Sequence, residues 1–368
     1  MDSSNNILNT NTEHFKQDLL DLVEHEMFCP IASHLFPDTP IEEVKRQLLA
    51  TESVQQFQST FMYQGCRWVI ENTMSDFTFS GTENLDGRPC LFISNHRDIV
   101  LDAMMLQYIM VGLGVDTSHV VIGANLFEIP IMPVLARLNK MYSIGRGGNG
   151  RQYYHSLMEM SQHLRQWVAE RGESVWIAQR NGRTKDGIDH TEPSLVKMIA
   201  YSGRKDNPEA ALQAMHITPV CVSYEWEPCA ALKARELCLS HQGSYTKAPG
   251  EDMQSVISGI TDFKGHVHFT ICPPLRPDEI AAVHGNHYAV ATLIDNRIDT
   301  GRQLWQNNLI ARQMLQGEKP ADTADTQAFA AYIDEACQRY PLGEHFRRQL
   351  LEIYANAVRE DSVIPTAQ

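Results

Sequence analysis

Short β-forming runs alternate with amphipathic stretches between residues 88 and about 275, and this alternation limits the possible folds more than any other feature. It is typical of a mostly parallel central sheet covered by helices on both faces. We therefore predict an α/β fold of this kind, with N- and C-terminal helical extensions. The predicted strands are 90–94, 120–123, 141–144, 174–178, 217–224 and 266–271. The predicted helices between them are 99–113, 128–139, 150–171 and 193–202.

The flanking segments carry helical patterns, which divide the chain into three predicted regions. We predict an N-terminal helical cap at residues 1–87, the α/β domain at 88–275 and a C-terminal helical region at 276–368. In parallel sheets, the loops after the carboxyl ends of the strands build the ligand site. Chemistry is therefore expected on those loops of the α/β domain.

The net charge of −14 limits the partners of the chain. An acidic chain binds nucleic acid poorly, so we expect no nucleic-acid partner. Residues 1–13 are polar and unlike a signal peptide, and no uncharged apolar stretch of about 18 residues occurs. We expect a cytoplasmic protein, with peripheral contact at the inner face of the cytoplasmic membrane as the closest approach to lipid. The eight cysteines contain no CxxC pair and are expected to be reduced thiols, not zinc ligands.

A polar segment, Asn95-His96-Arg97-Asp98, follows the predicted strand 90–94 at once. A helix is predicted to begin near residue 99, which puts His96 on a strand-to-helix loop. A carboxylate beside a histidine fixes its tautomer and raises its basicity, as acid–base catalysis requires. Asp98 and Asp102 are both candidates for that carboxylate, and Asp98 is also suited to capping the helix. We predict that His96 is a general base.

Two basic, glycine-containing loops, 142–151 and 176–187, follow later strands. Glycine lets backbone N–H groups approach an anion, and arginine binds phosphate with paired donors. Neither loop is a P-loop, because no Gly-Lys-Ser/Thr follows. In a chain of net charge −14, this local excess of cations predicts a phosphate-bearing ligand. The basic residues of the two loops are Arg146, Arg151, Arg180, Arg183 and Lys185.

No serine or cysteine is placed as an evident nucleophile beside these segments. One base and two phosphate-binding loops suit direct attack by a substrate hydroxyl, without a covalent acyl-enzyme. Helix 99–113 is rich in Met and Leu. We interpret it mainly as core, with an acyl-binding groove as the alternative.

In order and spacing, four segments of residues 88–275 resemble the glycerolipid (lysophospholipid) acyltransferase superfamily, which includes glycerol-3-phosphate and lysophosphatidic acid acyltransferases. The chain departs from the usual pattern twice, because five residues instead of four separate His96 from Asp102, and because Asn181 replaces a glutamate. His96 with Asp102 resembles the His-Asp block, Ile144-Gly145-Arg146 the phosphate-contacting block, Asn181-Gly182-Arg183-Thr184 the Glu-Gly-Thr-Arg block, and Pro219 the proline block.

The resemblance implies an O-acyltransferase that needs no cofactor and no metal. His96 would take a proton from an acceptor hydroxyl, and Asp102 would stabilise the imidazolium. The alkoxide would attack a fatty acyl thioester of coenzyme A or acyl carrier protein. The acceptor would be a phosphate-bearing lipid, either a glycerol-phosphate or a lysophospholipid. The substrate-binding residues inferred in this way are Arg97, Arg146, Arg151, Arg180, Asn181, Gly182 and Arg183.

Two other functions fit the same residues. A metal-dependent hydrolase would hold a divalent ion with His96, Asp98 and Asp102, joined by His266 and His268, which share one face of a strand. A catalytically inactive lipid-binding relative would keep the fold, and Asn181 at the glutamate position favours that interpretation. Metal content and acyl transfer to a panel of acceptors discriminate among these functions.

Overall fold

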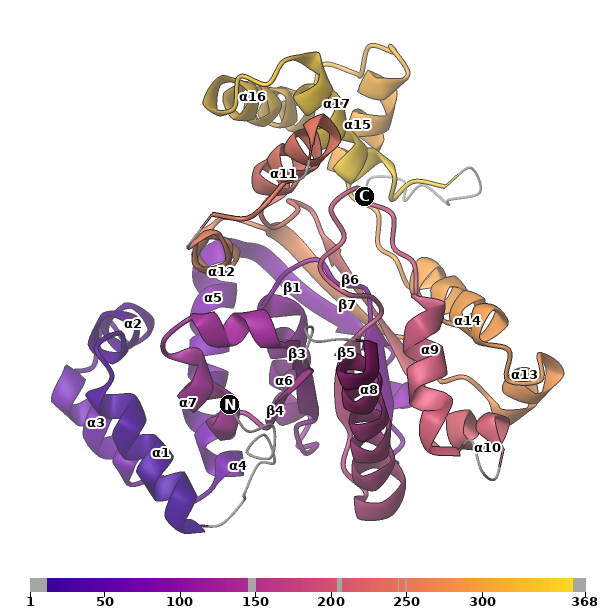
Figure 1. Ribbon diagram of the computed structural model, residues 1–368. Helices are drawn as coiled ribbons and strands as arrows, with labels where there is room; N and C mark the ends of the chain where they lie inside the picture. The colour runs from indigo at the N-terminus through magenta and orange to yellow at the C-terminus, as the bar shows by residue number, and fades with distance from the viewer. Residues whose placement is uncertain (1–11, 145–149, 204–206, 244, 249, 360–368) are drawn as a thin grey trace.

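Seven strands form one sheet in the part of the chain that the computed structural model describes, residues 12–359 without 145–149, 204–206, 244 and 249. Their order is β1-β7-β6-β2-β5-β3-β4 (Figure 1). Neighbouring strands from β6 to β4 are parallel, whereas β7 is antiparallel to β6 and β1 is parallel to β7. The predicted, mostly parallel α/β fold is confirmed. The strands are β1 Met74–Ser80, β2 Leu91–Ser94, β3 His119–Gly123, β4 Met141–Ile144, β5 Val175–Ala178, β6 Thr218–Tyr224 and β7 Gly265–Ile271.

Strand β1 is the strand of this sheet that the sequence analysis missed. Residues 1–87 are predicted to form a helical cap, but Met74–Ser80 form an edge strand that pairs with β7. Most of its residues are exposed, so it lacks the apolar run that marks the buried strands. The sheet therefore begins before the predicted boundary at residue 88. Whether the three predicted regions are separate domains stays a prediction.

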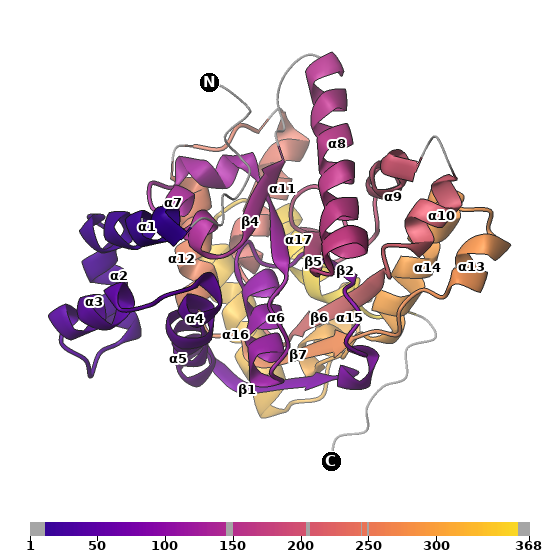
Figure 2. The same ribbon diagram turned by 90° about the horizontal axis from the view of Figure 1, so that it is seen from below.

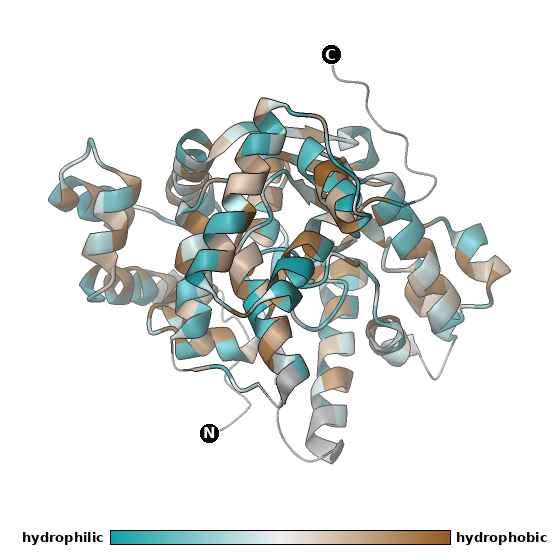
Figure 3. Cartoon of the chain, turned by 90° about the horizontal axis from the view of Figure 1, so that it is seen from above, coloured by the Kyte–Doolittle hydropathy of each residue, from teal (hydrophilic) through white to brown (hydrophobic). Residues whose placement is uncertain are grey.

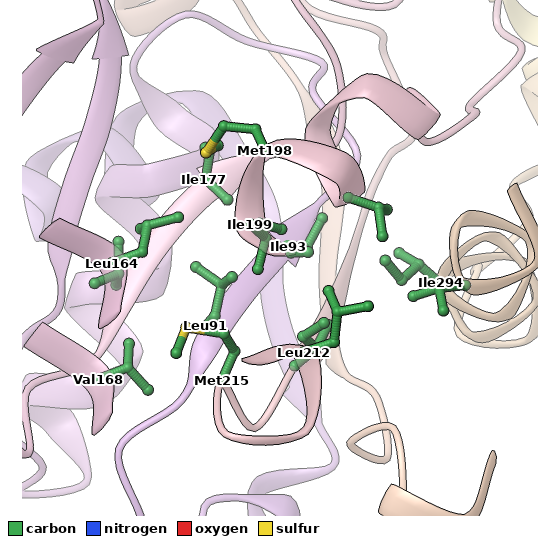
Figure 4. Packing of buried hydrophobic residues seen from close by; sticks show 14 of the residues in the cluster. Leu91, Ile93, Leu164, Val168, Ile177, Met198, Ile199, Leu212, Met215 and Ile294 are labelled. Atoms are coloured by element: carbon green, nitrogen blue, oxygen red, sulfur yellow. The ribbon is translucent and has the colours of Figure 1, made fainter. Parts of the chain in front are cut away.

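Side chains alternate across the sheet and build one core on each face. Leu91 and Ile93 of β2 lie on one face, where they meet Leu164, Ile199 and Ile294 (Figure 4). The other face packs against α5 and α6. The helices of the first face are α8 Gly150–Arg165, α9 Pro193–Ile199, α10 Pro208–Gln213, α13 Pro277–Ala282 and α14 His287–Thr300. Those of the second are α5 Tyr63–Thr73 and α6 Leu101–Gly112.

Two more helical groups flank the sheet. The N-terminal helices share an apolar cluster with α7 and α12, whereas α11 joins the C-terminal helices in another cluster at one end of the molecule (Figures 1 and 2). The first group is α1 Thr12–Glu24, α2 Phe28–Leu35, α3 Ile41–Leu49, α4 Val54–Phe57, α7 Met132–Leu138 and α12 Glu251–Thr261. The second is α11 Ala230–Gln242, α15 Gln306–Leu315, α16 Ala324–Arg339 and α17 Glu344–Ala355.

Polar and apolar residues are interspersed along the helices (Figure 3). This is the pattern of helices that bury one face and expose the other. Among the described residues, no helix is long and apolar enough to cross a membrane.

Candidate active site

The loops that follow β2 and β5 meet at the carboxyl edge of the sheet. The chain leaves β2 for α6 on one face and leaves β5 for α9 on the opposite face. Ligands of open α/β sheets bind in the crevice that forms where neighbouring strands diverge in this way. The backbone N–H of Thr184 in the β5 loop donates to the carbonyl of His96 in the β2 loop at 2.7 Å. The two predicted blocks are therefore joined directly.

His96 is paired with Asp102 of the first turn of α6. Its Nδ1 lies 2.9 Å from Asp102 Oδ2. The same oxygen accepts the backbone N–H of Arg97 at 2.6 Å and that of Asp98 at 2.9 Å. The other oxygen, Oδ1, accepts the Tyr224 hydroxyl at 3.0 Å. Because a carboxylate only accepts, Nδ1 of His96 carries a proton in this pair and Nε2 is the nitrogen left to take one.

Asp98, the rival partner of His96, has a different place. Its Oδ1 accepts the backbone N–H groups of Val100 and Leu101 at 2.8 Å each and so caps the start of α6. Its Oδ2 is buried, has no hydrogen-bond partner in the described structure, and faces Gly259, where a Cβ would lie 2.4 Å away. Burial and the neighbouring Asp102 raise the pKa of the Asp98 carboxyl. In this structure, Asp102 is the residue that contacts His96.

A cavity of about 660 Å³ opens at the crevice. β3 pairs with β5 only as far as Val120 and Trp176, although β5 pairs with β2 through Ala178. The two strands separate beyond that point, and the cavity enters between them, where Ile122 and Ile177 form part of its wall. The sequence-predicted site residues that line it are His96, Arg180, Asn181, Gly182 and Arg183.

Two arginines, Arg180 and Arg183, line this cavity, and each has a buried donor without a partner among the described residues. Arg183 is buried and donates from Nη2 to Ser255 Oγ at 3.2 Å, but its Nη1 has no partner among the described residues. The Nε of Arg180 is likewise buried without a partner. Lys247, by contrast, already pairs with Asp252 at 2.6 Å. A buried donor without an acceptor costs free energy, so an anion in the cavity would be stabilised by the arginines first.

A second cavity of about 110 Å³ adjoins the first and is almost entirely apolar. Ala103 and Met104 of α6 line it, whereas Leu101 and Met105 of the same helix are buried in the core. The helix predicted at 99–113 is therefore both core and cavity wall, and its role in an acyl-binding groove stays a prediction. The residues that line both cavities are Ile99, Ile122, Leu126 and Trp176.

Arg97 corrects a sequence prediction. It is predicted to bind substrate, but its side chain is buried and does not line the cavity. Its Nη2 donates to Asp189 Oδ2 at 2.8 Å and its Nη1 to Glu227 Oε2 at 3.3 Å. Successive side chains of an extended segment point to opposite sides, so the neighbour of His96 turns away from the cavity that His96 lines.

Residues 145–149 of the glycine-rich loop after β4 lie outside the described residues. Arg146 lies outside the described residues, and its predicted contact with phosphate stays a prediction. Arg151 belongs to the first turn of α8, but its side chain also lies outside the description. Its predicted role stays open in the same way.

Sequence reasoning did not single out Tyr224 and Asp189, although both contact the His96 loop. Tyr224 reaches Asp102 across 122 residues of sequence, and Asp189 reaches Asn95 across 94. Their roles arise from strand order, which no local pattern encodes. The sequence gives only an indirect indication of these two residues, because Tyr224 ends a predicted strand and Asp189 follows another.

The residues considered for a metal site are not brought together. His266 stacks on Trp305, and His268 contacts the hydroxyls of Thr78 and Ser80 on β1. Within the described residues, no group of three or more histidine, cysteine, aspartate or glutamate side chains is placed to hold a metal ion.

Comparison with known proteins defines the class. Residues 76–223 match the family model described as Acyltransferase, and this segment contains His96, Asp102, Arg183 and Pro219. The match covers the segment from which the resemblance was drawn and confirms that resemblance. No curated protein matches the chain. The crystal structure of the 1-acyl-sn-glycerophosphate (LPA) acyltransferase PlsC from Thermotoga maritima is similar over 80% of this chain and 97% of its own, with 14% identity and a TM-score of 0.42.

Proposed function

We propose that the protein transfers a fatty acyl group from a thioester of coenzyme A or acyl carrier protein to the hydroxyl of a glycerol-phosphate or lysophospholipid. The observation that carries the proposal is the His96–Asp102 pair, 2.9 Å apart, at a cavity that Arg183 also lines. The acyltransferase domain supplies the reaction class. The base and the anion-binding donors favour an acceptor that joins a hydroxyl to a phosphate.

The site supports direct attack of the acceptor on the thioester. Nε2 of His96 takes the hydroxyl proton as the oxygen attacks the acyl carbonyl, and Asp102 stabilises the imidazolium. Collapse of the tetrahedral intermediate breaks the C–S bond. The leaving thiolate then takes the proton back from His96, so the enzyme returns to its starting state. No resident cofactor enters these steps, because the thioester is itself the co-substrate.

The apolar cavity is suited to the acyl chain. It shares the wall residues Ile99 and Trp176 with the cavity of His96, and we propose that a chain whose carbonyl lies near the base extends into it. Apolar walls with a few polar groups at one end are typical of small-ligand sites. We also propose that the protein meets its lipid acceptor as a peripheral protein at the inner face of the cytoplasmic membrane.

A panel assay tests the reaction. The purified protein is incubated with glycerol 3-phosphate or a lysophospholipid and with either acyl-CoA or acyl carrier protein thioester, and thiol release and product are measured. We expect turnover with at least one pair. Absence of turnover with every pair would overturn the proposal and leave a lipid-binding role, whereas thioester hydrolysis without transfer would indicate a hydrolase.

Arg183→Ala is expected to raise KM for a phosphate-bearing acceptor about 10- to 100-fold, with a smaller change in kcat. The reason is that a charge-assisted hydrogen bond to the acceptor phosphate contributes about 1.5–3 kcal/mol. Steady-state kinetics with the acceptor varied measure the effect. The same acceptor without its phosphate serves as the control, because its KM should change little. Equal losses for both acceptors would contradict the role.

Ala103→Phe is expected to shift the preference toward shorter acyl chains. Ala103 lines the apolar cavity of about 110 Å³, and a phenyl ring there would occupy most of it. kcat/KM for a long-chain thioester should fall about tenfold more than for a short-chain one, because each buried CH₂ contributes about 0.8 kcal/mol. Competition between thioesters of different length measures the shift. An unchanged ratio would place the chain elsewhere.

A further inference from the structure

Asp189 is a buried carboxylate in the loop between β5 and α9, outside the cavity and outside the predicted site. Its Oδ2 accepts from Asn95 Nδ2 at 3.0 Å, from Arg97 Nη2 at 2.8 Å and from Arg302 Nη1 at 2.8 Å. Its Oδ1 accepts from Thr184 Oγ1 at 2.8 Å. Four donors from three separate segments of the chain therefore converge on one side chain.

These partners place Asp189 between the two catalytic loops. Asn95 and Arg97 are the residues on either side of His96. Thr184 follows Arg183 and also donates its backbone N–H to the His96 carbonyl at 2.7 Å. The hydrogen bonds of Asp189 thus tie the segment of the base to the segment of the anion-binding arginine.

The charges around Asp189 favour a single position of its carboxylate. Burial alone would raise the pKa of the Asp189 carboxyl, but the guanidinium groups of Arg97 and Arg302 hold it below its usual range. Arg302 lies between α14 and α15, so the helical region after the sheet also bears on this carboxylate. A charge that is buried and paired on several sides has one favourable geometry, because any displacement leaves a partner unpaired.

We propose that Asp189 is a positioning residue, which sets the His96 loop at a fixed distance from the Arg183 loop. This inference rests on the proposed acyltransferase function. A hydroxyl held by its phosphate reaches Nε2 of His96 only if the two loops keep their separation. Asp189 touches no substrate and acts through Asn95, Arg97 and Thr184.

Asp189→Asn tests the proposal, because it keeps the size of the side chain but turns one accepting oxygen into a donating NH₂ group and removes the negative charge that the four donors face. We expect kcat to fall about 100-fold, as misplacement by about 1 Å does in other enzymes, while KM for the thioester changes less than about threefold. A crystal structure of the variant, with the sheets superposed, should show the His96 loop displaced from the Arg183 loop. This second readout does not depend on turnover.

Two controls separate positioning from stability. Asp186→Asn alters another carboxylate of the same loop. That carboxylate accepts the backbone N–H of Ile188 and has no hydrogen bond to the His96 loop. Glu279→Gln breaks the ion pair with Arg297 between α13 and α14, far from the base, and should lower the melting temperature without lowering kcat. If Asp189→Asn does not fold, Thr184→Val removes one link and should lower kcat about tenfold with the thioester KM unchanged.

The outcomes are distinct. An inactive wild-type protein refutes the proposed function, and the crystal structure of the variant then decides whether Asp189 fixes the loops. An active wild-type protein whose Asp189→Asn variant keeps kcat within about threefold refutes the positioning role. A loss of kcat no greater than that of Glu279→Gln at equal loss of stability also refutes it.

Discussion

His96→Ala is expected to lower kcat for acyl transfer by about 10³-fold. The imidazole is the base that the cavity offers to a hydroxyl, and alanine cannot take the proton. KM for the thioester should change little, since the acyl chain and the thioester are bound by other residues. Single-turnover transfer from a labelled thioester measures the chemical step directly.

The loss should not reflect unfolding. The His96 side chain is 15% exposed, and its removal leaves Asp102 with the backbone donors of the loop and the Tyr224 hydroxyl. We expect a change in the free energy of unfolding of about 1 kcal/mol, the cost of one hydrogen bond. His14→Ala, on the exposed face of α1, is the matched control and should leave transfer unchanged. A rate near that of the wild type for His96→Ala would refute the assignment of the base.

Asp102→Asn is expected to lower kcat by about 10³- to 10⁴-fold, although the side chain keeps its shape. The asparagine amide can present its nitrogen to Nδ1 of His96, which favours the tautomer that carries its proton on Nε2. The nitrogen that faces the substrate is then unable to accept the hydroxyl proton. The imidazolium also loses its counter-charge. The rate measured over a range of pH reports the loss.

Asp98→Asn is the matched comparison, because it makes the same substitution four residues earlier in the chain. Its Oδ1 can still accept from Val100 and Leu101, so we expect the start of α6 and most of the activity to be retained. If Asp98→Asn lowers kcat as strongly as Asp102→Asn, the pairing seen in the structure is not the catalytic one.

Asp98→Asn should also change the pH dependence of stability relative to the wild type. Because the folded protein raises the pKa of Asp98, that carboxyl binds its proton more tightly in the folded state. Its stabilising contribution is present below its ordinary pKa and is lost as pH rises through the folded value. Asparagine does not ionise, so Asp98→Asn should gain stability relative to the wild type as pH rises above the ordinary aspartate pKa of about 4. Thermal unfolding of the variant and of the wild type, measured as pH rises from about 4, tests this gain. Stability curves of the two proteins that stay parallel would contradict the raised pKa of Asp98.

The sequence by itself determined the fold class and the position of His96, the candidate base. Each buried strand is an apolar run bounded by polar residues. A strand covered on both faces has no solvent-exposed face, so polar residues do not alternate along it. His96 follows such a strand at once, which is enough to place it at the carboxyl edge of a parallel sheet. Both inferences depend on residues that are neighbours in the chain, and local patterns record such neighbours well. The exposed edge strand β1 escaped, since little of it is buried.

The tertiary structure decided which side chains meet. It paired His96 with Asp102, assigned Asp98 to the start of α6, and turned Arg97 away from the cavity toward Asp189 and Glu227. The choice between Asp98 and Asp102 depends on the path of the backbone from β2 into α6, whereas the contacts of Arg97 join residues 92 and 130 positions apart. A charge is stabilised by whichever partners the fold brings within hydrogen-bond distance. The spacing of residues along the chain does not predict which partners those are.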